Sequence, residues 1–287
     1  MKLNWDQIEQ IIRNALQEDL GTQGDLTTHF AVADDIMGKA HFIAKQDLVL
    51  AGLPLVERVF ENVDPGLVFE GFYHDGDVIQ SGAAIAEVFG DLRSILTAER
   101  TALNFLQRMS GIATLTRQFA DAVQSTGTIL LDTRKTTPQL RALEKYSVRM
   151  GGGQNHRFGL YDMILIKDNH IEAAGGLGEA VSRCLDALDN MQLNIGIEVE
   201  VQTLEQLKEV LEYPVQQVML DNMDLETMKE AIRLADGKVK VEASGNVSLE
   251  TVRMIAETGV DYISVGALTH SAKAADISLN VLRKDGA

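Results

Sequence analysis

Polar side chains capable of chemistry follow almost every apolar run in the second half of this 287-residue chain. A single Asp, Ser or Thr at such a position would be explained by capping of a following helix. Capping does not explain lysines at the ends of apolar runs, or two acids and two lysines at the same kind of position. The pattern therefore indicates a shared polar site, built from Thr133, Arg134, Lys135, Lys167, Glu200, Asp221, Ser244, Gly245, Asn246, Val265, Gly266 and Ala267.

The last two clusters, SGN (244–246) and VGA (265–267), are small and glycine-rich. Loops of this kind expose backbone N–H groups, which can hold a phosphate monoester after the final strands of a barrel. Either tripeptide alone also fits an ordinary tight turn. Their occurrence after successive apolar runs predicts a phosphorylated substrate.

Two acids end neighbouring apolar runs, Glu200 and Asp221, and Glu198 shares a strand face with Glu200 because the two are two residues apart. One or two carboxylates with phosphate oxygens and water are the ligands that Mg²⁺ prefers. The pair therefore predicts a magnesium site at Glu200 and Asp221. The alternative is an ion pair of these acids with Lys135 or Lys167.

Arg134 and Arg157 flank the same expected site. Paired guanidinium groups can hold carboxylates in a bidentate fork, which lysine cannot do. The other basic residues have ordinary explanations at this point. Arg100 lies on a long helix and would pair with Glu99, and His156 after GGGQN would be a structural hydrogen-bonding group.

The elements that must position these residues alternate between apolar strands and amphipathic helices. Such alternation is typical of βα units and a parallel sheet that is buried on both faces. In a β/α barrel the strand ends meet at one mouth, where such enzymes carry out their chemistry. The expected strands are 128–132, 163–167, 195–200, 217–221, 239–243 and 262–266.

The first half has a different organisation. Helical spacing of apolar residues over 5–16, after a possible Asn4 cap, predicts a helix that ends at Leu20-Gly21. A strand-rich region follows, and then a long helical pattern over 92–124, in which Gly111 is a candidate position for a break or kink. We therefore expect an N-terminal α/β domain over 1–111 and a barrel over 112–275, with 276–287 returning to the first domain.

Composition limits the partners and the compartment. A formal charge of −16 argues against nucleic acid and anionic membranes, which require clustered Lys and Arg. Cys184 is the single cysteine, so it forms no internal disulfide, and its helical context predicts a small core residue. The first residues lack the apolar run of a signal peptide, and no segment reaches the length of a membrane span. These features predict a cytoplasmic protein.

Long segments of the chain resemble the quinolinate phosphoribosyltransferase family, also called carboxylating nicotinate-nucleotide pyrophosphorylases. The most specific are DTRKTTP (132–138) and NHRFGL (155–160) followed by IKDNH (166–170). Others, in the family's order and over nearly the whole chain, are EDLGTQGDLTT, AERTALNFLQRMSGIAT, EVEVQTLEQL, LDN, EASGNVSLETVRMIAETGVDYISVGALTHS and DISLNV.

The resemblance implies an α/β fold, with an N-terminal open-faced α/β sandwich domain and an incomplete β/α barrel of the type II phosphoribosyltransferases. It implies a homodimer, or a higher oligomer built from it, in which each N-terminal domain closes the partner's barrel. Arg100 would then reach quinolinate in the partner's site. Arg134, His156 and Arg157 resemble the family's binders of the two quinolinate carboxylates.

The resemblance also assigns the remaining site residues. Lys135 and Lys167 resemble lysines that meet the substrate carboxylate and the donor's phosphates, and Glu200 and Asp221 resemble the acids that hold Mg²⁺ and the ribosyl pyrophosphate. The loops at 244–246 and 265–267 resemble the cradle of the 5′-phosphate. Asn246, where many members carry glycine, and Lys273, where proline is common, are departures that leave this assignment in place.

The implied reaction joins quinolinate to 5-phosphoribosyl 1-pyrophosphate with Mg²⁺ and releases pyrophosphate and carbon dioxide, a step of NAD biosynthesis. Three other functions are also considered. A barrel isomerase or synthase for sugar phosphates would share the phosphate loops but would not need arginines aimed at a diacid. A phosphoribosyltransferase with another acceptor, and a non-catalytic sensor, remain; a sensor would have no reason to keep both acids and both lysines.

Overall fold

The computed structural model describes residues 4–282 and divides the chain into two compact units. The first consists of the chain up to Arg117, Thr136–Gly152, and the chain from Ser271 onward; the second consists of Gln118–Lys135 and Gly153–His270. The sequence placed the division near Gly111. In the structure, residues 136–152, which we expected in the barrel, belong to the first unit.

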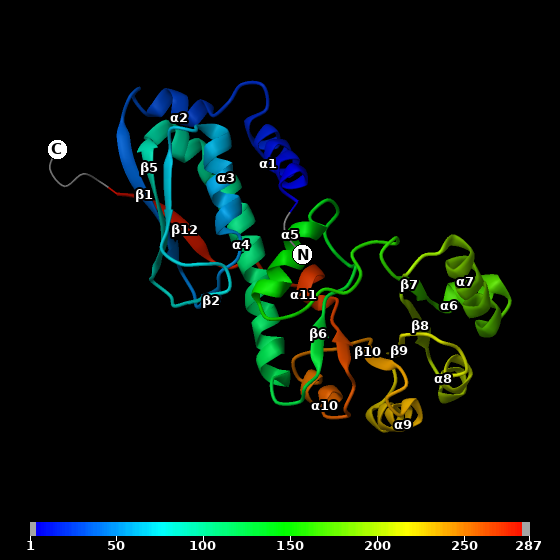
Figure 1. The fold of residues 1–287 in the computed structure, drawn as a ribbon. Coiled ribbons are helices and arrows are strands. Elements are labelled where there is room, and N and C mark those ends of the chain that lie inside the picture. Colours follow the sequence, from blue (N-terminus) through cyan, green and yellow to red (C-terminus); the bar gives the residue numbers. More distant parts are fainter. Residues whose placement is uncertain (1–3, 283–287) are drawn as a thin grey trace. The chain divides into compact units, whose positions relative to one another are not determined.

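The first unit contains an antiparallel sheet with the strand order β12-β1-β5-β3. The strands are β1 (Met37–Ala44), β3 (Val68–Gly71), β5 (Ala84–Asp91) and β12 (Ile277–Leu282). β12 pairs with β1, as the red and blue strands of Figure 1 show, so the last described strand completes the sheet that the first one begins. Phe42, buried on β1, packs edge-on against Phe60 within the hydrophobic core of this unit.

Helices cover this core. The apolar stripe of α1 (Trp5–Leu20) buries Ile8, Ile12 and Leu16, as the helical spacing predicted. Asn4 caps the helix by accepting a hydrogen bond from the backbone of Gln7, and Gly21 ends it. The other elements of this region are α2 (Leu26–Ala31), α3 (Leu53–Val63), and the paired short strands β2 (Leu48–Val49) and β4 (Val78–Ile79).

Gly111 does not break the long helix, because α4 (Leu92–Val123) continues through it for 32 residues. The glycine serves close packing instead. A Cβ atom at Gly111 would lie 2.0 Å from the carbonyl oxygen of Lys273, closer than real atoms approach. Only a residue without a side chain lets the chain near Lys273 lie against α4.

The second unit contains a parallel six-stranded sheet with the order β6-β11-β10-β9-β8-β7. β6 and β7 stand at the two ends of this order, which is the arrangement of an incomplete barrel and confirms the expected fold class. Every residue of β8 is buried, as expected for a strand covered on both faces. The strands are β6 (Ile129–Leu131), β7 (Ile164–Ile166), β8 (Ile197–Val201), β9 (Gln217–Asp221), β10 (Lys240–Ser244) and β11 (Tyr262–Ser264).

Two of the helices between these strands begin at residues that cap them. Thr203 caps α8 and Asp224 caps α9 through their side-chain oxygens. Glu200 and Asp221 stand a few residues earlier and cap neither helix, so capping does not explain them. The helices are α5 (Arg141–Met150, in the first unit), α6 (Asp168–Ala174), α7 (Leu177–Met191), α8 (Leu204–Val210), α9 (Leu225–Ala235), α10 (Val252–Ala256) and α11 (Ala267–His270).

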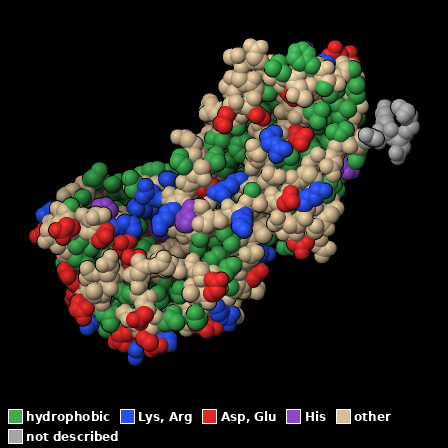
Figure 2. All heavy atoms as spheres, turned by 180° about the vertical axis from the view of Figure 1, so that it is seen from behind, with side chains coloured by type: hydrophobic (Ala, Val, Ile, Leu, Met, Phe, Trp, Pro, Cys, Tyr) green, Lys and Arg blue, Asp and Glu red, His purple; other side chains and the backbone are tan. Residues whose placement is uncertain are grey.

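The surface carries both signs of charge. Figure 2 shows red acidic and blue basic side chains interspersed over the visible face. A local group of basic side chains can therefore bind an anion, although the net charge of the chain is −16.

Candidate active site

A pocket of about 530 Å³ lies at the carboxyl ends of the strands in the second unit. Most of the residues that the sequence singled out line it together. They are Thr133, Arg134, Lys135, His156, Arg157, Lys167, Glu200, Asp221, Ser244, Gly245 and Asn246. The sequence analysis did not single out Leu165, Met219, Asn222 and Ser264 as site residues, and they complete the lining.

The other expected residues lie outside this lining. Val265 is buried, and its backbone N–H donates to the carbonyl of Leu131. Gly266 lies against Lys135, because a Cβ added there would be 3.1 Å from the lysine Cδ, and Ala267 begins α11. Arg100 is on α4 in the first unit, where its charge partly offsets the raised pKa that burial gives Glu99.

Two arginines, Arg134 and Arg157, line the pocket. Burial, and then the charge of Arg134, lowers the pKa of Arg157. Arg157 is held in place by a hydrogen bond from its Nη1 to the carbonyl of Met163, at 3.1 Å. Two like charges at one place favour an anion between them, and a carboxylate suits guanidinium groups best.

The middle of the pocket carries two acids and two lysines. Lys167 Nζ donates to Oε2 of Glu200, so the ion pair that the sequence offered as an alternative is present. The Asp221 carboxylate has no ion pair or side-chain hydrogen bond among residues 4–282. Carboxylate oxygens here match the donor set that Mg²⁺ prefers, so the residues present fit this ion.

The loop after β10 also lines the pocket. Gly245 has φ +97°, and a Cβ there would lie 2.2 Å from Oδ1 of Asn222. Asn246 also has a positive φ, and its Nδ2 donates to the same Oδ1 at 3.0 Å. This loop can bend only because glycine occupies position 245, which leaves its backbone exposed toward the pocket.

The floor of the pocket is a buried polar network around His156. Its Nε2 lies 3.0 Å from Glu198 and 3.4 Å from Glu242. Gln217 Nε2 donates to both acids at 2.8 Å. The ligand atoms of the two acids and His156 lie within 4.8 Å of one another, a spacing that would also suit a metal ion. A protonated imidazole supplies the same positive charge without one.

The charge of His156 follows from its neighbours. Burial alone would lower its pKa, but hydrogen bonds to Glu198 and Glu242 outweigh burial and raise it to about 9. The backbone nitrogen of Arg157 lies 2.7 Å from Nδ1, a contact that suits a neutral ring. The two carboxylates favour a protonated ring, and protonation at Nδ1 would require the backbone N–H of Arg157 to turn away from it.

The network contains residues that the sequence analysis missed, namely Gln217, Glu242 and Ser264. Burial raises the pKa of Glu242, and the charge of Glu198 adds to this, although His156 opposes it. The signal was present in the sequence, because VKVEA places a glutamate inside an apolar run just as IGIEVE does. An acid at such a position is buried with partners.

The loops that carry the basic residues are anchored below the pocket. Asp132, fully buried, accepts hydrogen bonds from the backbone of His156 at 2.9 Å and from the side chain of Asn155 at 2.6 Å. Thr269 donates to the carbonyl of Lys135 at 2.8 Å. These bonds fix the backbone next to Arg157 and at Lys135.

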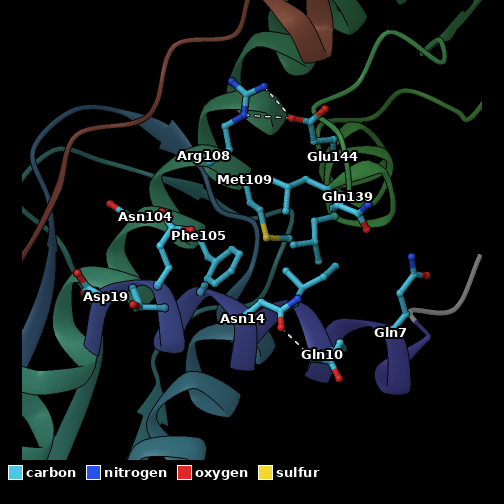
Figure 3. Close-up of a pocket in the computed structure, with 16 residues that line it drawn as sticks. Gln7, Gln10, Asn14, Asp19, Asn104, Phe105, Arg108, Met109, Gln139 and Glu144 are labelled. Atoms are coloured by element: carbon cyan, nitrogen blue, oxygen red, sulfur yellow. Dashed lines mark hydrogen bonds and ion pairs between the residues drawn. The ribbon is translucent and has the colours of Figure 1, made fainter. Parts of the chain in front are cut away.

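A second cavity of about 530 Å³ lies in the first unit, against α1, α4 and α5 (Figure 3). Arg108 and the buried Glu144 form an ion pair at 2.7 Å at its edge, and Gln10 and Asn14 are hydrogen-bonded on α1. None of the expected site residues lines this cavity, so it is not the candidate active site.

Cys184 is half-buried, not a full core residue as expected, and burial raises the pKa of its thiol. It therefore carries no nucleophilic thiolate at neutral pH. Within residues 4–282, no helix combines the length and the apolar character that crossing a bilayer requires.

The fold and the pocket define a β/α-barrel enzyme for substrates that carry both carboxylate and phosphate groups. Comparison with known families identifies the family to which this enzyme belongs. Residues 25–110 match the domain described as "Quinolinate phosphoribosyl transferase, N-terminal domain", and residues 112–280 match the corresponding C-terminal domain. The chain belongs to the quinolinate phosphoribosyltransferase family.

Relatives in plants and bacteria cover almost all of the chain. A quinolinate phosphoribosyltransferase (decarboxylating) from Nicotiana glauca is 48% identical over 96% of this chain and 82% of its own. A probable nicotinate-nucleotide pyrophosphorylase (carboxylating) from Bacillus subtilis is 41% identical over 97% and 95%. The solved nicotinate-nucleotide pyrophosphorylase from Francisella tularensis superposes with a TM-score of 0.93 at 42% identity, covering 98% of each chain.

Proposed function

We propose that this chain is a decarboxylating quinolinate phosphoribosyltransferase of NAD biosynthesis. It joins the ring nitrogen of quinolinate to the anomeric carbon of 5-phosphoribosyl 1-pyrophosphate. Nicotinate mononucleotide, pyrophosphate and carbon dioxide are the products. One observation carries this proposal: a single pocket is lined by both arginines, both lysines, both acids and the glycine-dependent loop.

The arginine end binds the acceptor. Arg134 and Arg157 hold the two carboxylates of quinolinate and direct its ring nitrogen toward the centre of the pocket. His156 adds positive charge from the floor. Its ring is only 7% exposed and its Nε2 is directed to Glu198 and Glu242. His156 therefore acts through its charge and not as a direct ligand of the carboxylate, which modifies the role that the resemblance gave it.

The loop end binds the donor. The loop at 244–246, with Gly266 and Ala267 beside it, holds the 5′-phosphate through backbone N–H groups. Glu200 and Asp221 would hold Mg²⁺ together with the pyrophosphate. Bound there, the ion would neutralise charge that develops on the leaving pyrophosphate. Lys135 and Lys167 add fixed positive charge on the same group.

The chemistry requires positioning and electrostatics, with no covalent nucleophile. As pyrophosphate departs, the ribosyl carbon acquires oxocarbenium character, and the pyridine nitrogen attacks it. The nitrogen becomes cationic once the new bond forms. That cation stabilises the carbanion left on the adjacent carbon when carbon dioxide leaves, and a proton from solvent completes the product.

The proposal includes a homodimer with shared sites, in which Arg100 of each subunit reaches the partner's acceptor. The resemblance of the AERTALN segment supports this assignment. We also propose a cytoplasmic location, which the single cysteine supports, since the fold needs no disulfide.

The experiment is an assay with quinolinate, the ribosyl pyrophosphate donor and Mg²⁺, in which carbon dioxide and nicotinate mononucleotide are both measured. We expect the two products in equal amounts. Nicotinate, which lacks one carboxylate, is the control acceptor and should react far more slowly. Formation of nucleotide without carbon dioxide, or preference for nicotinate, would contradict the proposal.

The Mg²⁺ assignment has a separate test. Asp221→Asn should raise the Mg²⁺ concentration for half-maximal rate by about tenfold, because a neutral amide is a weaker ligand than a carboxylate. Asp236→Asn is the matched control, since Asp236 ends α9 with a positive φ that asparagine also adopts. Equal metal dependence of the two variants would exclude Asp221 as a ligand.

A further inference from the structure

Asn222 contacts each of the three residues of the loop at 244–246. Its backbone N–H donates to the carbonyl of Ser244 at 3.0 Å. Its amide group lies against Gly245, where a Cβ atom would be 2.2 Å from Oδ1 and 2.9 Å from Nδ2. Its Oδ1 accepts a hydrogen bond from Nδ2 of Asn246 at 3.0 Å. One residue therefore borders the whole loop, although the sequence analysis gave Asn222 no role.

Asn222 also stands between the two groups that we propose to hold the donor. It directly follows Asp221, the proposed Mg²⁺ ligand, and it lines the same pocket. The register of β9 and β10 pairs Asp221 with Ser244. The two strands thus bring the Asp221 carboxylate and the start of the loop to one level, and Asn222 is the first residue beyond that pairing. It is placed to fix the loop relative to the metal ligand.

The residue type at position 222 follows from the backbone and from the charge of the ligand. Asn222 has φ +54°, in the left-handed region, which asparagine adopts more readily than most residues other than glycine. Glycine would satisfy this backbone but would offer no amide to the loop. Aspartate would add a negative charge beside a pocket for phosphate. Asparagine combines the required backbone with a neutral acceptor oxygen.

The loop keeps its own hydrogen-bond donors for a ligand. Within residues 4–282, the backbone N–H groups of Gly245 and Asn246 have no acceptor. Such groups are paired by water or by a bound anion. Asn222 holds the loop through the Ser244 carbonyl and the Asn246 side chain, so it leaves these two N–H groups unused.

We propose that Asn222 is a positioning residue, which sets the conformation of the loop at 244–246 before the donor substrate binds and so directs the loop's N–H groups at the phosphate monoester. Asn246 takes part through its side chain, a role that glycine at this position could not have. The proposal rests on the proposed function for the identity of the phosphate. It adds to the phosphate site a residue that lies on a different strand connection from the loop itself.

The test is a double-mutant cycle read by calorimetry with ribose 5-phosphate, a phosphate monoester without pyrophosphate. Asn246→Gly, which keeps the left-handed backbone and removes the hydrogen bond, should weaken binding about twofold to tenfold. Asn222→Gly should weaken it at least as much. In the Asn222→Gly background, Asn246→Gly should cause a clearly smaller loss, because its hydrogen-bond partner is already absent. Equal losses in the two backgrounds would overturn the proposal.

Two controls separate positioning from general damage. Gln192 follows α7 with a φ of +53° and lies outside the pocket lining, so Gln192→Gly tests glycine at a left-handed position by itself and should leave ribose 5-phosphate affinity unchanged. Pyrophosphate with Mg²⁺ is the internal reference, because we place it at the acids and lysines. Its affinity should be unaltered in Asn222→Gly. An equal loss of pyrophosphate affinity would mean a general defect of the pocket and would overturn the proposal.

Crystal structures of the ligand-free variants give a readout that is independent of binding. In Asn222→Gly the loop should lie in a different position or in several. Asn222→Asp should keep the loop in place, because a carboxylate oxygen accepts from Asn246 as the amide oxygen does. An unmoved loop in Asn222→Gly, or a displaced loop in Asn222→Asp, would overturn the proposal. If the wild type did not bind ribose 5-phosphate, the proposed phosphate site would fail, while these structures would still decide the role of Asn222.

Discussion

Lys167 donates a hydrogen bond from Nζ to Oε2 of Glu200, while Asp221 on the neighbouring strand has no ion-pair partner among residues 4–282. The lysine therefore occupies the acid that we propose as a metal ligand. On the proposed assignment, binding of Mg²⁺ with the donor would displace it, and the ammonium group would then be available to the donor's phosphates. Lys167 would thus compete with the metal before the substrate arrives and assist it afterwards.

Replacement of Lys167 by methionine should separate these two effects. Without the competing ammonium, the protein should bind Mn²⁺, a spectroscopic substitute for Mg²⁺, up to about fivefold more tightly, a small gain because the lysine is partly exposed. The turnover number should fall by about a hundredfold or more, because charge on the leaving pyrophosphate is no longer balanced. Lys240→Met, which breaks an exposed pair with Asp261, is the control. Weaker metal binding in Lys167→Met would contradict the competition.

The arginine pair should determine the affinity for the diacid. Arg157→Ala or Arg134→Ala should raise the KM for quinolinate about tenfold to a hundredfold, the loss of a charge-assisted bidentate contact. Steady-state kinetics should show little change in the KM for the ribosyl pyrophosphate donor. Arg157→Lys should recover only part of the loss, because lysine keeps the charge but not the fork. The exposed Arg183 is the control position, and an unchanged KM for quinolinate would refute the assignment.

His156 should make the stability of the fold depend on pH. Its pKa rises from 6.5 to about 9 on folding, so its contribution is complete below about pH 6.5 and is lost as the pH rises through about 9. Urea unfolding of the wild type and of His156→Gln should differ by on the order of 2 kcal/mol at about pH 6 and much less at about pH 10. A difference that stays constant over this range would mean that the ring is neutral throughout.

Gly245 should be essential for a geometric reason. Gly245→Ala would bring a Cβ atom within 2.2 Å of Asn222 Oδ1, at a φ of +97°. Gly259→Ala is a matched control, with a φ of +96° and nothing within 4 Å of the added atom. Both variants should lose about 1 kcal/mol from backbone strain, measured by thermal unfolding. Only Gly245→Ala should also lose affinity for ribose 5-phosphate, and equal affinities would contradict the proposed phosphate loop.

The sequence predicted the barrel strands and most of the pocket because both depend on local pattern. Apolar runs mark buried strands, and the residues directly after them must lie at the mouth of a parallel barrel. Lys135, Lys167 and Asp221 were identifiable in this way without knowing any contact.

The errors have a common cause, which is contact between residues far apart in the chain. Gly111 resembles a helix breaker in sequence, and only the approach of the chain near Lys273 explains it. Glu242 and Ser264 lie inside apolar strands, where their sequence context is that of core residues. Their polar roles depend on hydrogen bonds with Gln217 and Ser244 on other strands. The low exposed fraction of the His156 ring likewise depends on residues outside its own segment of sequence, such as Glu198 and Glu242.

Shared active sites can be tested by mixing two inactive variants. Arg100→Ala removes the residue that we propose to reach the partner, and Lys135→Ala disables the barrel of its own subunit. In a mixed dimer, the barrel that keeps Lys135 receives a normal Arg100 from its partner. Freely reassorted subunits should therefore recover about a quarter of the wild-type rate.

The matched control mixes Lys135→Ala with Lys167→Ala. Both changes lie in the same pocket of the second unit, so each barrel in a mixed dimer carries one defect. No activity should return, although the subunits exchange equally well. Recovery in the first mixture and not in the second requires that one site draw residues from two chains. Absence of recovery in the first mixture, with dimers verified by light scattering, would show that Arg100 acts within its own subunit or not at all.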